Sequence, residues 1–116
     1  SIPDLILKKD YTLALEQISK ILQKSHYLEI LGFLQTSITN LLKTKVYSSS
    51  CSSLDISRKT GQHEFVVKKN LEKLKKTDVA ELLRLKLNLT QVEYMLKTGQ
   101  IDPMGAFCKM FTEELK

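Results

Sequence analysis

The residue types that bind metals or hold phosphates are few in this chain and stand far apart. Its two histidines, His26 and His63, each lack a cysteine or a second histidine at the spacing of metal ligands. Its four glycines are isolated, whereas a nucleotide site usually needs a glycine-rich turn so that backbone amides can approach the phosphates. We therefore expect no bound metal and no cofactor.

Catalytic residues are equally hard to assemble from this sequence. Acid–base catalysis needs carboxylates or a histidine gathered in a cleft, but most Asp and Glu residues here occupy expected helix starts and solvent-facing positions, where capping explains them. Glu113 and Glu114 fit a solvated chain end. The G-x-S-x-G turn that presents a nucleophilic serine does not occur. We therefore expect that this chain alone is not an enzyme.

The strongest local pattern is a basic segment that has the shape of a helix-turn-helix. Two short helices are expected, Leu54–Thr60 and Glu64–Lys76, with a hinge at Gly61. Between Arg58 and Lys76, seven Lys and Arg residues stand against two Glu residues, an excess as large as the net charge of +5 of the whole chain. Such a segment could contact a nucleic-acid backbone or an acidic protein.

Several marks of a DNA-reading helix are missing from this segment. Glu64 stands at the start of the second helix, where donors to a phosphate or a base edge are expected, and arginine is scarce. Three interpretations stay open: sequence-specific DNA reading, nonspecific contact with nucleic acid, and a solvated face or dock for an acidic protein. The candidate contact residues are Arg58, Lys59, Lys68, Lys69, Lys73 and Lys97, and the turn from Lys97 to Asp102 is a second candidate patch.

A long central helix at about 77–98 organises the elements that must position these residues. Thr77 or Asp78 can cap its start, Glu81 completes a capping box, and Gly99 supplies the left-handed residue that ends a helix. Its apolar residues cover most of the circumference, which predicts a place in the middle of a bundle. The main stripe is Leu82, Leu85, Leu89, Val92 and Leu96, and the flanking stripe is Leu83, Leu87 and Tyr94.

The other elements are also expected to be helices. A short helix follows Ser1, a second runs over Tyr11–Leu22 with Asp10 as its cap, and a third runs from about His26 to Val46 with Ser25 as its cap. A last helix covers Met104–Leu115. The inward residues expected on the four longer flanking helices are Leu15, Ile18, Leu22; Tyr27, Leu31, Leu34, Ile38, Leu41; Phe65, Val67, Leu71, Leu74; and Met104, Phe107, Cys108, Phe111, Leu115.

Length and composition fit one all-α domain, a compact bundle of six or seven helices. The chain has 116 residues, of which 42% are hydrophobic and 27% charged. The serine-rich segment Ser48–Ser53 is expected to be a mobile loop within that domain. Cys51 and Cys108 are expected to be free thiols, and no signal peptide or membrane-spanning run is recognisable, so we expect a cytoplasmic location and no membrane partner.

The order of these parts resembles the C-terminal (collar) domain of the bacterial DNA polymerase III delta subunit, from the clamp loader. The likeness spans nearly the whole chain, although the family often has proline before the phenylalanine and aspartate in the acid position, where this chain has Glu64 and Glu93. The segments that carry it are Leu5–Leu15, Ile30–Leu42, Ile56–Lys69 and Glu93–Gly99.

The resemblance implies a non-catalytic collar domain of six or seven helices that joins delta to gamma/tau and delta-prime type subunits in a pentameric ring. That ring belongs to a DNA polymerase holoenzyme. Residues 1–116 would then be a single C-terminal domain of a longer protein, whose absent N-terminal, ATPase-like part contacts the sliding clamp. Primer-template DNA is a candidate partner of the full assembly. The alternative functions are a small helix-turn-helix-like nucleic-acid-binding module and a helical adaptor unrelated to replication.

Overall fold

Seven α-helices and one short 3-10 helix make up residues 1–115, which the computed structural model describes together with the side chains of residues 1–111. No strand occurs in that part of the chain, which confirms the predicted all-α fold. The elements are α1 (Ile2–Leu7), α2 (Tyr11–Leu22), α3 (Tyr27–Tyr47), α4 (Ser53–Thr60), α5 (Glu64–Lys73), η1 (Leu74–Lys76), α6 (Val79–Lys97) and α7 (Pro103–Leu115).

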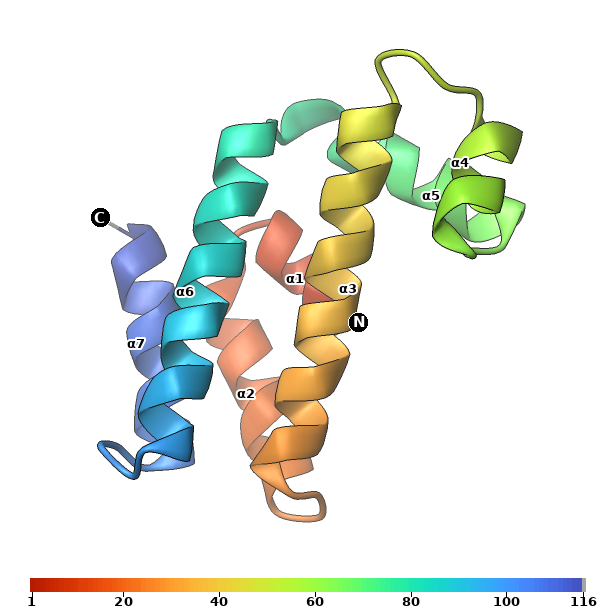
Figure 1. Cartoon of the computed structure of the whole chain (residues 1–116). Coiled ribbons are helices and arrows are strands. Elements are labelled where there is room, and N and C mark those ends of the chain that lie inside the picture. Colours follow the sequence, from red (N-terminus) through yellow and green to blue (C-terminus); the bar gives the residue numbers. More distant parts are fainter. Residues whose placement is uncertain (116) are drawn as a thin grey trace.

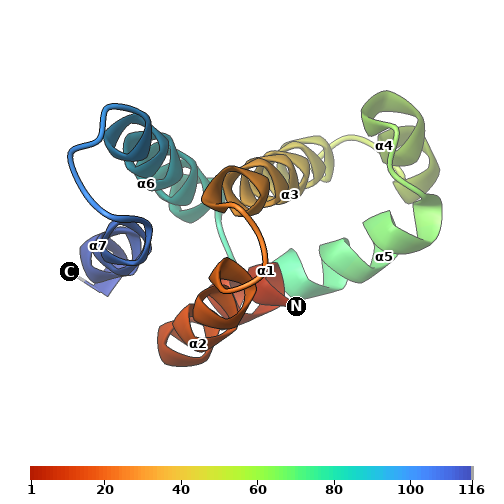
Figure 2. The same cartoon turned by 90° about the horizontal axis from the view of Figure 1, so that it is seen from below.

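Two long helices, α3 and α6, lie side by side and form the centre of the molecule (Figure 1). α7 packs against the other flank of α6, and α2 packs against both α3 and α7. α4 and α5 lie on the far side of α3 from α6 (Figure 2). The helix-turn-helix-like pair therefore stands at one end of the body and contacts the rest mainly through α3.

The core lies between these helices and follows the predicted apolar stripes. All five residues of the main α6 stripe are buried, as are Leu31, Leu34 and Ile38 of α3. From α7, Phe107 and Phe111 are fully buried, and the ring of Phe111 stacks on that of Tyr11 with centroids 5.2 Å apart. Aromatic rings bury the largest apolar area per residue, so α7 contributes strongly to the core.

α6 lies at the centre of the molecule, as its apolar pattern predicted, but its flanking stripe is not buried. Leu83, Leu87 and Tyr94 are 46%, 67% and 63% exposed. The reason is the number of neighbours: α6 packs mainly against α3 and α7, and two neighbouring helices leave an arc of a third helix uncovered.

The inward orientation expected for Phe65 is also wrong, since its side chain is 63% exposed. On α5 and the following turn, Val67 and Leu74 are fully buried, and their spacing of two helical turns places them on one face. Phe65 lies two positions before Val67, a rotation of about 200°, and therefore faces the opposite side.

Smaller differences concern caps and boundaries. α3 is capped by His26, whose ring Nδ1 accepts a hydrogen bond from the amide of Leu28 at 3.2 Å, and not by Ser25. The inward face of α2 is centred on Tyr11, Ala14 and Ile18, while its predicted members Leu15 and Leu22 are half-buried. The orientations expected for Glu113, Glu114 and Leu115 lie outside the described side chains.

Candidate interaction surfaces

The turn between α4 and α5 is fixed by hydrogen bonds that tie it to α3. Gly61 ends α4 in the left-handed conformation, with φ of 76°, which favours glycine because a Cβ is strained there. The hydroxyl of Ser57 donates to the carbonyl of Gln62 at 2.5 Å. The side-chain amide of Gln62 donates in turn to the hydroxyl of Thr44 at 3.1 Å, and Thr44 is fully buried on α3. The helix-turn-helix-like shape predicted from the sequence is therefore present and anchored.

Three of the six candidate cations are already paired with carboxylates of the same chain. Each pair is partly exposed and therefore contributes little to stability, but it offsets the positive charge available to a partner. The pairs are Lys68 with Glu64 at 3.5 Å, Lys73 with Asp4 at 2.7 Å, and Lys97 with Glu93 at 3.3 Å.

Two further candidates lie over aromatic rings. The ammonium group of Lys59 is 5.2 Å from the ring centroid of Tyr47, and that of Lys69 is 5.4 Å from the ring of Phe65. Both distances suit a cation–π contact. Arg58 is exposed, and among the described residues it has no hydrogen bond, ion pair or ring contact. It is therefore the one candidate whose charge is unpaired in the part of the chain that the structure describes.

The six candidate residues do not form one patch. Five of them lie on α4 and α5, whereas Lys97 is the last residue of α6, and Figures 1 and 2 both show α6 and the α4–α5 pair on opposite sides of α3. The second candidate patch, the turn after Lys97, is accordingly a separate surface.

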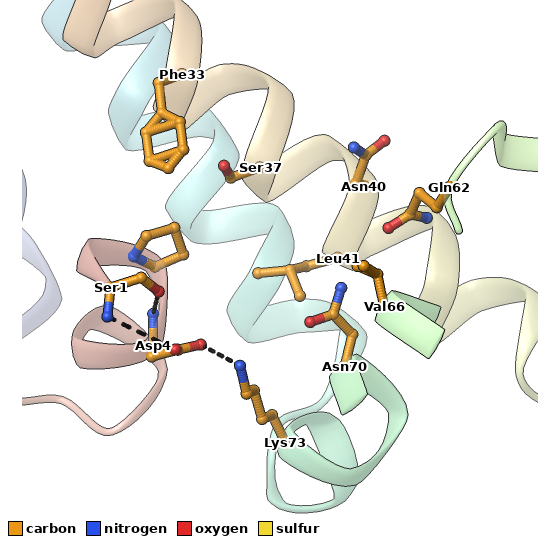
Figure 3. Close-up of a pocket in the computed structure, with 11 residues that line it drawn as sticks. Ser1, Asp4, Phe33, Ser37, Asn40, Leu41, Gln62, Val66, Asn70 and Lys73 are labelled. Carbon is orange, nitrogen blue, oxygen red and sulfur yellow. Dashed lines mark hydrogen bonds and ion pairs between the residues drawn. The ribbon is translucent and has the colours of Figure 1, made fainter. Parts of the chain in front are cut away.

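A groove runs between α1, α3 and α5, and Figure 3 shows the side chains that line it. Asp4 of α1 and Lys73 of α5 face each other across it, while Phe33 and Ser37 come from α3 and Val66 from α5. Partial burial opposes ionisation of Asp4, but the hydrogen bonds and charges of Lys73 and Ser1 outweigh it and lower the pKa of the carboxyl group. The Asp4–Lys73 pair thus joins the first helix to the basic segment.

A second groove gathers lysines that the sequence analysis did not connect. Lys8 and Lys9, which follow α1, line it together with Lys73 and Lys76, and the carboxylates of Asp4 and Glu81 lie in the same lining. Lys9 has a left-handed backbone, with φ of 62°, and no sequence signal marks that conformation at a lysine. The only sequence clue was the Lys8-Lys9 pair itself, whose nearness to Lys73 and Lys76 depends on the tertiary fold.

Three large side chains with apolar surface are uncovered on the long helix α6. We call Leu83, Leu87 and Tyr94 the α6 ridge. Beside it, between α3 and α6, lies a shallow depression lined by Gln35, Thr36, Thr39, Asn40, Lys43 and Lys86. The α6 ridge consists of large side chains with apolar surface, whereas the depression is lined by polar and basic side chains.

The described part of the chain has neither a cluster of metal ligands nor a helix of membrane-spanning character. No three His, Cys, Asp or Glu side chains there lie close enough to share a metal ion, and no helix there is both long and apolar enough to cross a bilayer. Cys51 and Cys108 are both partly buried, and neither forms a disulfide in the described part of the chain. The carboxylates of Asp4, Glu64 and Glu93 form ion pairs with candidate cations.

The described part of the chain is all-α and leaves Leu83, Leu87 and Tyr94 uncovered on the long helix α6. The family model described as "DNA polymerase III delta subunit, C-terminal domain" matches residues 1–113. The chain therefore belongs to this family and is part of the clamp loader, as the resemblance implied. Neither the search of curated proteins nor the search of solved structures found a match.

Proposed function

We propose that this domain joins the delta subunit to neighbouring clamp-loader subunits of the gamma/tau and delta-prime type during DNA replication. In this proposal it carries out no reaction of its own. Membership of the delta C-terminal family supports the assembly, and the uncovered apolar side chains of α6 support the mode of action. A cytoplasmic location follows from the same proposal.

The observation that carries the proposal is the exposure of the α6 ridge. Leu87 and Tyr94 are each about two-thirds exposed, at 67% and 63%, although the opposite face of the same helix is fully buried core. Burying apolar area releases roughly 25 cal/mol per Å², and tyrosine is among the residues that interfaces favour. A surface of this kind gains stability when a partner covers it.

We also propose that residues 1–116 form one domain of a longer protein. The family description names a C-terminal domain of the delta subunit. An N-terminal, ATPase-like part would then make the contact with the sliding clamp, and this domain would contribute only the contacts between subunits.

Co-elution in size-exclusion chromatography tests the joining role. The full-length delta protein and a version lacking residues 1–116 are each mixed with gamma/tau and delta-prime subunits. The full-length protein is expected to elute within the complex, and the shortened protein is expected to elute apart. Failure of the full-length protein to co-elute, or full retention of the shortened one, would contradict the proposal.

Nucleic-acid binding is the second candidate function, and the lysine-lined groove at Lys8, Lys9, Lys73 and Lys76 favours it. Primer-template DNA titrated at several salt concentrations separates it from the first. Binding that weakens steeply with salt, and less steeply once the groove residues Lys8, Lys9 and Lys76 or the α5 residues Lys68, Lys69 and Lys73 are changed to alanine, would support phosphate contacts. Absence of binding near physiological salt would remove this candidate. Lys68, Lys69 and Lys73 already contact Glu64, Phe65 and Asp4 of the same chain, which favours the joining role.

A further inference from the structure

The three residues of the α6 ridge form a straight line along the helix. Leu83 and Leu87 are four positions apart, and Tyr94 follows seven positions, or about two turns, after Leu87, so all three point to the same side. At about 1.5 Å per residue the ridge is roughly 16 Å long. This length corresponds to about three turns of a partner helix.

The shape of the α6 ridge favours a helix as the partner segment that binds it. The backbone groups of α6 bond within the helix, so no free edge is offered to an extended strand, and only side chains can make the contact. Apolar side chains three and four positions apart on one helix fit the grooves between side chains on another. The occupant is therefore a helix with an apolar stripe of its own.

The positive charges beside the ridge favour acidic side chains next to the apolar stripe of the partner helix. Lys43 and Lys86 line the adjoining depression, whose other lining residues are uncharged. Arg84 lies three positions before Leu87 on the outer side of α6, is exposed, and has no partner among the described residues. The border of the ridge is therefore cationic.

The carboxylate of Glu93, on the side of α6 that faces α3, is already engaged. One oxygen of Glu93 lies 3.3 Å from the ammonium group of Lys97, and the other accepts a hydrogen bond from Gln35 at 3.4 Å. Gln35 also accepts a hydrogen bond from the ammonium group of Lys86 and so links it to Glu93, but no ion pair joins Glu93 to Lys86 or to Lys43 among the described residues. An incoming acidic side chain would complement the remaining positive charge.

A second copy of this chain is a poor match for the same surface. In a two-fold dimer the same surface of both copies meets, so the cations Arg84, Lys86 and Lys43 of one copy would enter an interface that holds the same cations of the other. The net charge of +5 adds to this repulsion. The observations favour a different and acidic partner.

We infer that the α6 ridge and the adjoining depression bind an amphipathic helix of a neighbouring clamp-loader subunit, with an apolar stripe against Leu83, Leu87 and Tyr94 and acidic side chains toward Lys43, Lys86 and Arg84. This inference rests on the proposed function and adds to it the surface and the chemistry of the partner.

The apolar part is tested by measuring the affinity of the full-length delta protein for its purified gamma/tau and delta-prime partners. The double change Leu87→Ser with Tyr94→Ser is expected to weaken binding about tenfold or more, because a few central anchors carry most interface energy. Phe65→Ser is the matched control, since Phe65 is also 63% exposed but lies on α5; it is expected to change affinity less than twofold, that is, by about 0.4 kcal/mol or less. Circular dichroism checks that each variant is folded.

The charge part uses Lys43→Glu with Lys86→Glu, compared with the control Lys75→Glu. Lys75 is exposed and pairs with Glu72 away from α6. The ridge-side pair is expected to weaken binding about tenfold at low salt and less at high salt, because screening shortens the reach of charges. The control is expected to keep wild-type affinity.

The outcomes separate the inference from the proposed function. If wild-type delta binds its partners and all ridge variants bind equally well, the ridge is not the docking surface, although the joining role stands. If wild-type delta does not bind, both fail. If sedimentation shows that delta self-associates and that Leu87→Ser with Tyr94→Ser abolishes it, a second copy occupies the ridge and the acidic-partner inference is overturned.

Discussion

At the scale of single residues, the contact between Asp4 and Lys73 links the start of the chain to its basic segment. The two charged atoms are 2.7 Å apart, and both side chains are about one-third exposed. Because this contact lowers the pKa of Asp4, the folded state holds the proton less tightly than the unfolded state, whose aspartate pKa is about 3.9. The contribution to stability is thus present above that value and is lost as the pH falls through the folded pKa.

The first prediction concerns the loss of this contribution when Asp4 cannot ionise. Asp4→Asn is expected to lower the free energy of unfolding by about 0.5 kcal/mol at neutral pH, the usual size for a partly exposed pair. It is expected to have a smaller effect at about pH 3, below the pKa of an unfolded aspartate, where part of the contribution of the carboxylate is lost. Urea unfolding at both pH values measures the difference. Asp55→Asn is the control, because Asp55 also lies in the first turn of a helix but forms no ion pair among the described residues. An equal loss at both pH values would contradict the account.

Sequence reasoning succeeded for residues whose role is local. The predicted caps were Asp10 for α2 and either Thr77 or Asp78 for α6. The carboxylates of Asp10 and Asp78 accept from backbone amides three positions later, at 3.3 and 2.8 Å. Gly99 was predicted to be left-handed and has φ of 72°. His26 was missed as a cap because a histidine ring accepts an amide only in a suitable orientation and tautomer. The nearness of Lys8 and Lys9 to Lys73 was missed because it depends on the tertiary fold.

At the scale of elements, periodicity located every helix but did not reveal how many neighbours each one has. The α6 pattern is apolar over most of the helix circumference, yet its flanking stripe is uncovered because the helix packs mainly on two others. The side chain of Phe65 was predicted to point inward, but Val67 and Leu74 define the buried face of this segment and Phe65 does not lie on it. The sequence therefore predicts that the residues of the α6 ridge are apolar, but only the packing of the helices shows that they are exposed.

The second prediction concerns the hinge between α4 and α5. Gly61→Ala is expected to destabilise the protein by about 1 kcal/mol, because an alanine is strained at φ of 76°. Gly32→Ala is the matched control within α3. A Cβ at Gly32 would meet no atom within 4 Å, so alanine is expected to stabilise by up to about 1 kcal/mol through its higher helix propensity. Thermal and urea unfolding give both values, and a change of the same sign in both variants would count against this view of the hinge.

At the scale of the whole molecule, the all-α fold and the family were predictable, because they depend on the order of apolar stripes, caps and turns along the entire chain. The packing of α7 on α6 and the position of the α4–α5 pair beyond α3 were not. Those arrangements are set by contacts between segments that no local pattern specifies. The surface that we assign to a partner is a consequence of that packing.

The third prediction separates the apolar residues that hold the fold from those left for a partner. Phe107→Ala is expected to lower the free energy of unfolding by about 3–5 kcal/mol, because it empties a fully buried position. Leu87→Ala is expected to change it by less than about 0.5 kcal/mol, because that side chain is 67% exposed. Denaturant titrations measure both. A large loss in the Leu87 variant would mean that the ridge serves folding.

The central claim is that the α6 ridge meets a neighbouring subunit, and photo-crosslinking tests it most directly. A photoreactive phenylalanine analogue replaces Leu87 in full-length delta, or Phe65 as the control, and each protein is irradiated within the assembled clamp loader. We expect a crosslink from position 87 to a helix of an adjacent subunit that carries acidic residues beside its apolar stripe, and none from position 65. Crosslinks from position 65 alone, or none from position 87 in a complete complex, would contradict the account.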